Sequence, residues 1–321
     1  MGCTRNSSDP SSVVTVYSSR ADHLIKPIFD LYQERTGQEV RFLTDSEGPL
    51  MERLKAEGAN SPADLFLTVD AGNLWKAAEE GLLRPIQSKK LEQAIPAHLR
   101  DPENQWFGLS LRARTILYSP ERVSPSDLST YEALADEAWA GRLCMRTSRK
   151  VYNQSLVAAL IAHHGQERAE QIVGAWVRNL ATEVFPNDTD LIRAIAAGQC
   201  DVGIANSYYF GRLLRDQPDF PVRLFWASLE NSGTHLNVSG AGVTRHAKNP
   251  EGAQALLEWL TEPEAQKAFA ELNLEYPIVT EVARDPIVEG WGSFQGDLLN
   301  LRSLGELQTQ AVQLMDRVQY R

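Results

Sequence analysis

The sequence predicts an α/β fold that is divided into two lobes. Three observations support this prediction. Short apolar runs alternate with amphipathic stretches from residue 13 to residue 81, a longer strand-like run at residues 109–118 interrupts them, and the alternation then restarts. Strands that alternate with helices at this spacing form right-handed βαβ units around a largely parallel sheet.

The first lobe opens with three expected strands, each followed by an expected helix. The strands are predicted at residues 13–17, 40–44 and 63–69. The helices are predicted from about residue 24 to 36, and at 48–58 and 73–80. Gly37 is expected to end the first helix, because glycine readily adopts the left-handed conformation found at helix C-termini.

The second lobe begins where the strand-like run at residues 109–118 crosses out of the first. The strands and helices expected after it are at residues 141–145, 155–163, 168–181, 190–197, 202–205 and 222–226. A polar, hinge-like run at 230–237 and a strand at 239–243 lead the chain back. Helices at 250–261 and 264–272 should then pack on the first lobe.

These elements define the expected domain organisation. Residues 1–12 form a polar tether. Residues 13–110 and 237–287 form lobe 1, and residues 111–236 and 288–321 form lobe 2. Two α/β lobes joined by two extended crossings are typical of binding proteins that close on a ligand about a hinge.

Composition and charge exclude several classes of partner. The 321 residues suffice for two domains with substantial cores, and a charged content of 23% is typical of soluble globular proteins. The net charge of -10 argues against nucleic acid or an anionic membrane as a partner. The apolar runs are too short to span a bilayer. We expect a monomer without a membrane span.

The three cysteines fall into two groups. Cys144 and Cys200 each lie eight residues before a tyrosine, so they occupy matched positions in the second lobe. Either a disulfide joins them, which would imply an oxidising compartment, or both are buried free thiols on adjacent strands. Cys3 begins a polar stretch similar to the lipidated end of bacterial lipoproteins, although the apolar signal segment is absent. A lipid anchor at Cys3 is therefore a further expectation.

Tyrosines follow the two strands that carry these cysteines. Tyr208 and Tyr209 come directly after the strand at 202–205, and Tyr152 follows the strand at 141–145. In open α/β sheets ligands bind at the carboxyl ends of the strands, where these tyrosines could meet. A hard trivalent cation prefers anionic oxygen donors, and phenolates are such donors. Packing residues are the alternative interpretation of each tyrosine taken alone.

Enzyme motifs are missing. The sequence contains no Gly-x-Ser-x-Gly elbow and no glycine-rich phosphate loop. Asp64 and Asp70 fit capping or structural roles. The six histidines are scattered and no Cys-x-x-Cys occurs, which argues against a zinc site. We therefore do not expect an enzyme.

Five segments together carry a resemblance to a known family. They are Tyr17-Ser18-Ser19-Arg20, Leu67-Thr68-Val69-Asp70-Ala71-Gly72, Val151-Tyr152-Asn153-Gln154-Ser155, Asn206-Ser207-Tyr208-Tyr209 and the run from Thr234 to Gly242. Over residues 13–290 the chain resembles bacterial periplasmic ferric-iron-binding proteins of the cyanobacterial branch. The resemblance implies the type II periplasmic binding protein fold, capture of Fe(III) between the lobes, and delivery to an ABC permease.

The resemblance also implies roles for single residues. Tyr152, Tyr208 and Tyr209 match positions that supply phenolate ligands. Arg112 and Arg212 match positions beside the metal.

One position departs from the family pattern. Tyrosine-rich members carry a His-Tyr pair where this chain has Ala21-Asp22. A carboxylate is also a hard oxygen donor, but it is shorter than tyrosine. Three outcomes follow: Asp22 ligates the metal directly, water bridges it to the metal, or a synergistic anion such as carbonate fills the gap. Arg20, Arg112 or Arg212 could hold that anion.

Two other functions remain open at this stage. A protein of the same architecture could bind an organic or oxyanionic solute, using residues such as Ser18, Ser19 and Arg20 at the strand ends. An iron-holding protein could also protect a cellular component instead of supplying a permease. Visible absorption separates the first alternative, because only an iron–phenolate site is coloured.

Overall fold

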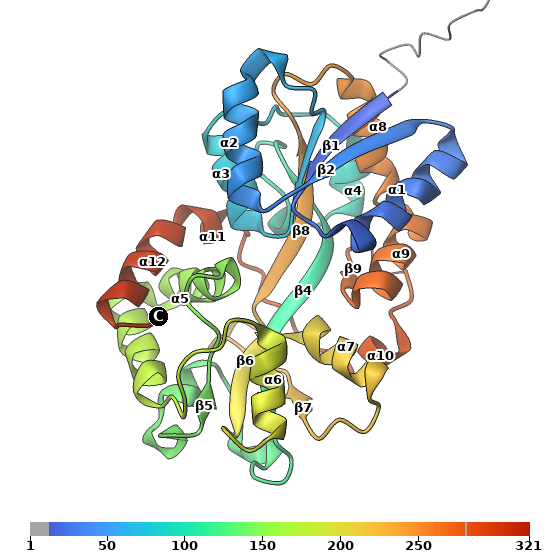
Figure 1. Cartoon of the computed structure of the whole chain (residues 1–321). Helices are drawn as coiled ribbons and strands as arrows, with labels where there is room; N and C mark the ends of the chain where they lie inside the picture. Colours follow the sequence, from blue (N-terminus) through green and yellow to red (C-terminus); the bar gives the residue numbers. More distant parts are fainter. Residues whose placement is uncertain (1–12, 280) are drawn as a thin grey trace, which may run out of the picture.

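The computed structural model describes residues 13–279 and 281–321. The chain forms two α/β lobes that share one path of paired strands (Figure 1). The strands are β1 (Val13–Ser18), β2 (Glu39–Thr44), β3 (Leu65–Thr68), β4 (Phe107–Tyr118), β5 (Leu143–Cys144), β6 (Val202–Asn206), β7 (Arg223–Phe225), β8 (Leu236–Val243) and β9 (Tyr276–Pro277). Their order along the sheet is β2-β1-β3-β8-β4-β6-β5, with β7 and β9 also paired to β4.

Helices cover this sheet in both lobes. Those of the first half are α1 (Asp22–Thr36), α2 (Glu47–Glu57), α3 (Ala71–Glu79) and α4 (Lys89–Ala94). The second lobe contributes α5 (Val151–Arg178), α6 (Asp188–Ala196) and α7 (Ser207–Asp216). The chain ends with α8 (Pro250–Trp259), α9 (Pro263–Asn273), α10 (Pro286–Glu289), α11 (Arg302–Glu306) and α12 (Gln308–Arg317).

The two long strands, β4 and β8, join the lobes. From Phe107 to Ala113, β4 pairs with β8; from Arg114 to Tyr118, it pairs with β6 of the second lobe. The strand therefore changes partner between Ala113 and Arg114. The two-lobed fold predicted from the sequence is confirmed, while the exact lobe boundaries stay a prediction.

Strand direction is mixed. β1 runs parallel to β2 and β3, and β5 runs parallel to β6. All pairings of β4 and the pairing of β3 with β8 are antiparallel. Parallel pairing is thus less extensive than the sequence pattern predicted, because the return crossing β8 inserts between β3 and β4.

The end of α1 agrees with the sequence prediction, whereas the extent of α5 differs from it. α1 ends at Thr36 as predicted: Gly37 has φ 74° and its N–H donates to the carbonyl of Gln33. Two helices were expected at 155–163 and 168–181, whereas α5 runs from Val151 to Arg178, broken only by non-helical dihedrals at Gly165. α5 therefore begins early enough to place Tyr152 in its first turn.

The C-terminal helices brace both lobes. α8 and α9 pack on β1 and α1 of the first lobe, as predicted. α12 packs on α5, and α11 contacts both α5 and α3 (Figure 1). The end of the chain also supports the loop before α5, because the Tyr320 hydroxyl donates to the Arg146 carbonyl at 2.6 Å.

A disulfide joins the two strands that lead to the tyrosines. Cys144 lies in β5 and Cys200 lies two residues before β6, and their sulfur atoms are bonded. Cys3, the expected lipid anchor, and the tether at residues 1–12 lie outside the described residues. Within the described ranges, no helix is long and apolar enough to cross a membrane.

Candidate metal centre

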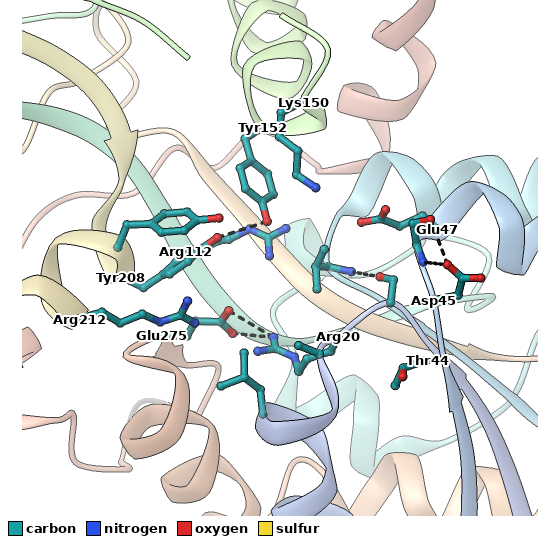
Figure 2. Close-up of a pocket in the computed structure, with 16 residues that line it drawn as sticks. Arg20, Thr44, Asp45, Glu47, Arg112, Lys150, Tyr152, Tyr208, Arg212 and Glu275 are labelled. Atoms are coloured by element: carbon teal, nitrogen blue, oxygen red, sulfur yellow. Dashed lines mark hydrogen bonds and ion pairs between the residues drawn. The ribbon is translucent and has the colours of Figure 1, made fainter. Parts of the chain in front are cut away.

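Three tyrosines converge on a cleft between the lobes. Tyr152 lies in the first turn of α5, and Tyr208 and Tyr209 lie in the first turn of α7. All three line a cleft of about 410 Å³. The Tyr208 hydroxyl donates to the Tyr152 hydroxyl at 3.2 Å (Figure 2). The ring centroids of Tyr208 and Tyr209 lie 4.3 Å apart. The structure thus brings together the three tyrosines that the sequence indicated.

These tyrosines lie close together because β5 and β6 are parallel neighbours, so the helices that follow them begin at the same edge of the sheet. β6 ends at Asn206 and α7 begins at Ser207, so no loop separates Tyr208 from the sheet. The Asn153 side chain fixes the loop before α5 by donating to the carbonyl of Arg146 at 2.8 Å. Both tyrosine-bearing turns are therefore held by the fold before any ligand binds.

Cations surround the tyrosine rings. The Arg112 guanidinium lies 5.0 Å from the Tyr152 ring centroid, and the Arg212 guanidinium lies 5.1 Å from that of Tyr208. The Lys150 ammonium lies 4.9 Å from the Tyr152 ring. An anionic oxygen formed in this cleft would therefore be stabilised by nearby positive charge.

The arginines differ in their other contacts. Arg112 donates to the Val238 carbonyl at 3.2 Å and to the Ser239 hydroxyl at 3.3 Å. In the part of the chain that the structure describes, Arg212 makes only its contacts with the tyrosine rings. Arg212 is therefore the arginine with the most freedom to bind an anion.

Arg20 also lines the cleft but is already paired. Its guanidinium lies 2.9 Å from a carboxylate oxygen of Glu275, and both side chains are almost fully buried. Burial raises the pKa of Glu275, but Arg20, Arg112 and the hydroxyl of Ser110 outweigh burial and hold it below its ordinary value. Holding an anion would require Arg20 to share its charge with Glu275.

Burial keeps Tyr208 and Tyr209 neutral when the cleft is empty. The pKa of Tyr208 is raised well above 10.0, first by burial and then by Tyr152 and Tyr209, against the lowering effect of Arg112. The pKa of Tyr209 is also raised, by burial and then by Tyr152 and Asp188. Binding a cation to these oxygens must therefore displace protons.

Asp22 lies outside the cleft lining. It is the exposed first residue of α1, and its carboxylate accepts a hydrogen bond from the Thr44 hydroxyl. The preceding residue, Ala21, and Thr44 itself do line the cleft. Direct ligation by Asp22 would require it to leave Thr44.

Asp70 and His235 have structural roles. Asp70 caps α3, accepting from the Gly72 amide at 2.8 Å, and burial raises its pKa to about 6. The His235 ring lies 3.1 Å from the Ser155 hydroxyl, and burial lowers its pKa to about 3. Among the described residues, no group of three or more histidines, cysteines, aspartates or glutamates could hold a metal.

Sequence reasoning missed four charged residues of the cleft: Asp45, Glu47, Lys150 and Glu275. Glu275 lies far along the chain from every motif that was singled out. Lys150 had a usable signal, because it stands two residues before Tyr152. Glu47 belongs to the wall of lobe 1, which is formed by the β2–α2 connection.

Comparison with known proteins places the chain in a family. Residues 28–295 match the family described as bacterial extracellular solute-binding protein. The chain is 44% identical over 322 residues to iron uptake protein A2 of Synechocystis, with 98% of this chain and 92% of that protein covered.

Solved structures agree with this placement. The Trichodesmium protein FutA (IdiA), solved in complex with iron and citrate, is 46% identical with a TM-score of 0.92, covering 96% of this chain and all of that one (100%). The apo ferric ion-binding protein A of Pasteurella haemolytica is 37% identical with a TM-score of 0.89, covering 96% of this chain and 98% of that one. The chain belongs to the bacterial extracellular solute-binding proteins, and its close relatives include cyanobacterial iron uptake proteins.

Proposed function

We propose that the protein captures ferric iron in the interlobe cleft and delivers it to an ABC permease. The observation that carries the proposal is the convergence of Tyr152, Tyr208 and Tyr209 on one cleft. The names of the relatives support it, since one is an iron uptake protein and another was solved with iron and citrate. Delivery to a permease is the usual task of a solute-binding protein in the periplasm.

The donor set suits a trivalent ion. A bound metal ionises its ligands, so the tyrosines lose their protons as iron enters. Three phenolates then balance three positive charges, which lets the cleft enclose a nearly neutral unit. Calcium and magnesium prefer carboxylates, carbonyls and water, so this donor set favours ferric iron over both.

We further propose that an anion or water completes the coordination. Lobe 1 presents Ala21-Asp22 where tyrosine-rich members of the family carry a His-Tyr pair, and the Asp22 carboxylate, at the tyrosine position, accepts a hydrogen bond from Thr44. Arg212, which has no hydrogen bond or ion pair in the described part of the chain, is placed to hold a carboxylate or carbonate against the metal. Arg112 and Arg20 add positive charge behind it.

The proposal is tested by a visible absorption titration of the purified apoprotein. A chelated ferric salt is added in three parallel series: with no added anion, with bicarbonate, and with citrate. A charge-transfer band that saturates at one equivalent supports a tyrosine-bound ferric site. A band that needs one of the anions identifies the missing ligand.

The opposite result is equally informative. No band in any of the three series would contradict ferric binding. The cations of the cleft would then favour an organic or oxyanionic solute, which calorimetry with the anions alone would detect.

A further inference from the structure

Lys150 and Glu47 face each other across the cleft from opposite lobes. Lys150 precedes α5 of lobe 2, and Glu47 is the first residue of α2 in lobe 1. Both line the cleft and both are half-buried. In Figure 2 the Lys150 side chain extends past Tyr152 toward the side of the cleft where Glu47 lies.

Among the described residues, neither the Lys150 ammonium nor the Glu47 carboxylate has an ion-pair partner. Over the described ranges, Lys150 makes one side-chain contact, with the Tyr152 ring at 4.9 Å, and its ammonium has no carboxylate partner. The Glu47 carboxylate has no ion pair or hydrogen bond within the same ranges. A half-buried charge without a partner loses hydration and gains little in return.

Local helix electrostatics make Lys150 unusual. It occupies the N-cap of α5, and its side chain makes no capping hydrogen bond. Ser, Thr, Asp and Asn are preferred at this position, and a cation is disfavoured by the positive end of the helix dipole. Glu47 is favoured at the start of α2 for the opposite reason. Lys150 therefore needs an anion from outside its own helix.

Glu47 is the best-placed carboxylate on the facing wall. Asp22 accepts a hydrogen bond from Thr44. Asp45 accepts one from the backbone N–H of Ser46 at 2.7 Å. Of these three carboxylates, only that of Glu47 accepts no hydrogen bond among the described residues, so it is available to a partner across the cleft.

We propose that Lys150 and Glu47 form an interlobe ion pair when the cleft closes, and that this pair slows the release of the bound ligand. The inference rests on the proposed ferric function of the same cleft. The pair would lie beside Tyr152, so its formation would cover the metal from solvent. An ion pair of this exposure changes a rate by roughly two- to fivefold.

Charge reversal provides the test. The iron-loaded protein is mixed with excess chelator, and the decay of the charge-transfer band gives the release rate. Glu47→Lys and Lys150→Glu should each speed release by at least about twofold, since each places like charges across the cleft. The double variant, which restores opposite charges, should return toward the wild-type rate. Raising the ionic strength should shrink the differences.

A matched control lies outside the cleft. Lys90 pairs with Glu262 on the surface of lobe 1, and both side chains are partly exposed. Lys90→Glu should leave the release rate unchanged. A second measurement needs no variant: a zero-length carbodiimide cross-linker should join Lys150 to Glu47 in the iron-loaded wild-type protein, as detected by peptide mass mapping.

The outcomes separate the two proposals. A double variant no slower than the single variants, with no cross-linked peptide, overturns the ion pair. Faster release from Lys150→Glu alone, with Glu47→Lys unchanged, also overturns it and assigns Lys150 to a bound anion. A wild-type protein that shows no band overturns the ferric function and the ion pair with it.

Discussion

The hydroxyl of Tyr208 donates a hydrogen bond to the hydroxyl of Tyr152 at 3.2 Å, although 56 residues separate the two in the sequence. Each tyrosine lies in the first turn of a helix that follows a strand. A disulfide links Cys144, the last residue of β5, to Cys200, two residues before β6. The oxygens are thus in place before a ligand arrives. A preorganised donor set lowers the ordering cost of binding.

Removing one hydroxyl should abolish most ferric binding. Tyr152→Phe deletes one of three proposed anionic donors, and loss of a direct ligand should cost more than the roughly 10- to 100-fold associated with outer-shell partners. Competition titration against a chelator of known affinity measures the loss. Tyr276→Phe is the matched control, because Tyr276 is buried near Tyr208 and its hydroxyl has no hydrogen-bond partner among the residues that the structure describes. Equal losses in the two variants would contradict ligation by Tyr152.

Iron loading should release protons, and affinity should fall with pH. Burial raises the pKa values of Tyr208 and Tyr209, so both are neutral in the empty cleft at neutral pH and must ionise to bind. Each proton displaced makes binding tenfold weaker per unit fall in pH, and three tyrosines give up to about three protons. Titration in weakly buffered solution counts them directly. Release of no protons at constant pH would exclude phenolate ligation.

Asp22 should contribute little to ferric affinity. Asp22 is exposed, and its carboxylate accepts a hydrogen bond from the Thr44 hydroxyl, so it can coordinate the metal only if that hydrogen bond is broken. Asp22→Asn should therefore change the affinity by only a few-fold and leave the band position in place. A large loss, or a shifted band, would instead assign Asp22 as a direct ligand. The measurement is repeated with bicarbonate, since an anion could mask the loss.

The sequence predicted the parts of the site that lie in continuous motifs. Tyr208 and Tyr209 follow an apolar strand directly, and Tyr152 follows another at the same spacing from a cysteine, so strand-end reasoning was enough to find them. Gly37 could be predicted to end a helix from its residue type alone, because glycine is favoured at helix C-termini. Such features depend on short stretches of chain, where propensity and pattern are informative.

Long-range features escaped that reasoning. Glu275 pairs with Arg20 although 255 positions separate them in the sequence, and no local sequence pattern around either residue predicts this ion pair. The antiparallel insertion of β8 beside β4 likewise depends on how the second crossing returns. The full length of α5 was missed because its first turn contains a polar segment and its middle contains Gly165, each of which locally opposes a helix. Tertiary packing decides these cases.

The disulfide should stabilise the second lobe. Cys144 and Cys200 close a loop of 56 residues, and cross-linking a loop of that length removes unfolded-state entropy worth on the order of 4 kcal/mol. The double variant Cys144→Ala/Cys200→Ala should lose free energy of unfolding by that amount in urea denaturation. A reducing agent should destabilise the wild-type protein and leave the double variant unchanged. Equal responses would show that the thiols are unpaired.

The Arg20–Glu275 pair should give the protein an acid-sensitive step in stability. The pKa of Glu275 lies below its ordinary value of 4.5, because the nearby arginines and Ser110 outweigh burial. A lowered folded-state pKa stabilises the fold above the unfolded-state value, and that stabilisation is lost as pH falls through the folded-state value. Glu275→Gln should lose about 3–5 kcal/mol at neutral pH, since it leaves Arg20 buried and unpaired.

The same variant should also change the shape of the pH profile. Because glutamine does not ionise, urea denaturation between pH 7 and pH 3 should show a shallower acid decline for Glu275→Gln than for the wild-type protein. Glu264→Gln is the control: Glu264 pairs with Arg35 at the surface, with partly exposed side chains, and should cause little change. If both variants follow the wild-type acid decline in parallel, the buried pair is not its source. The decline would then have to come from other carboxylates.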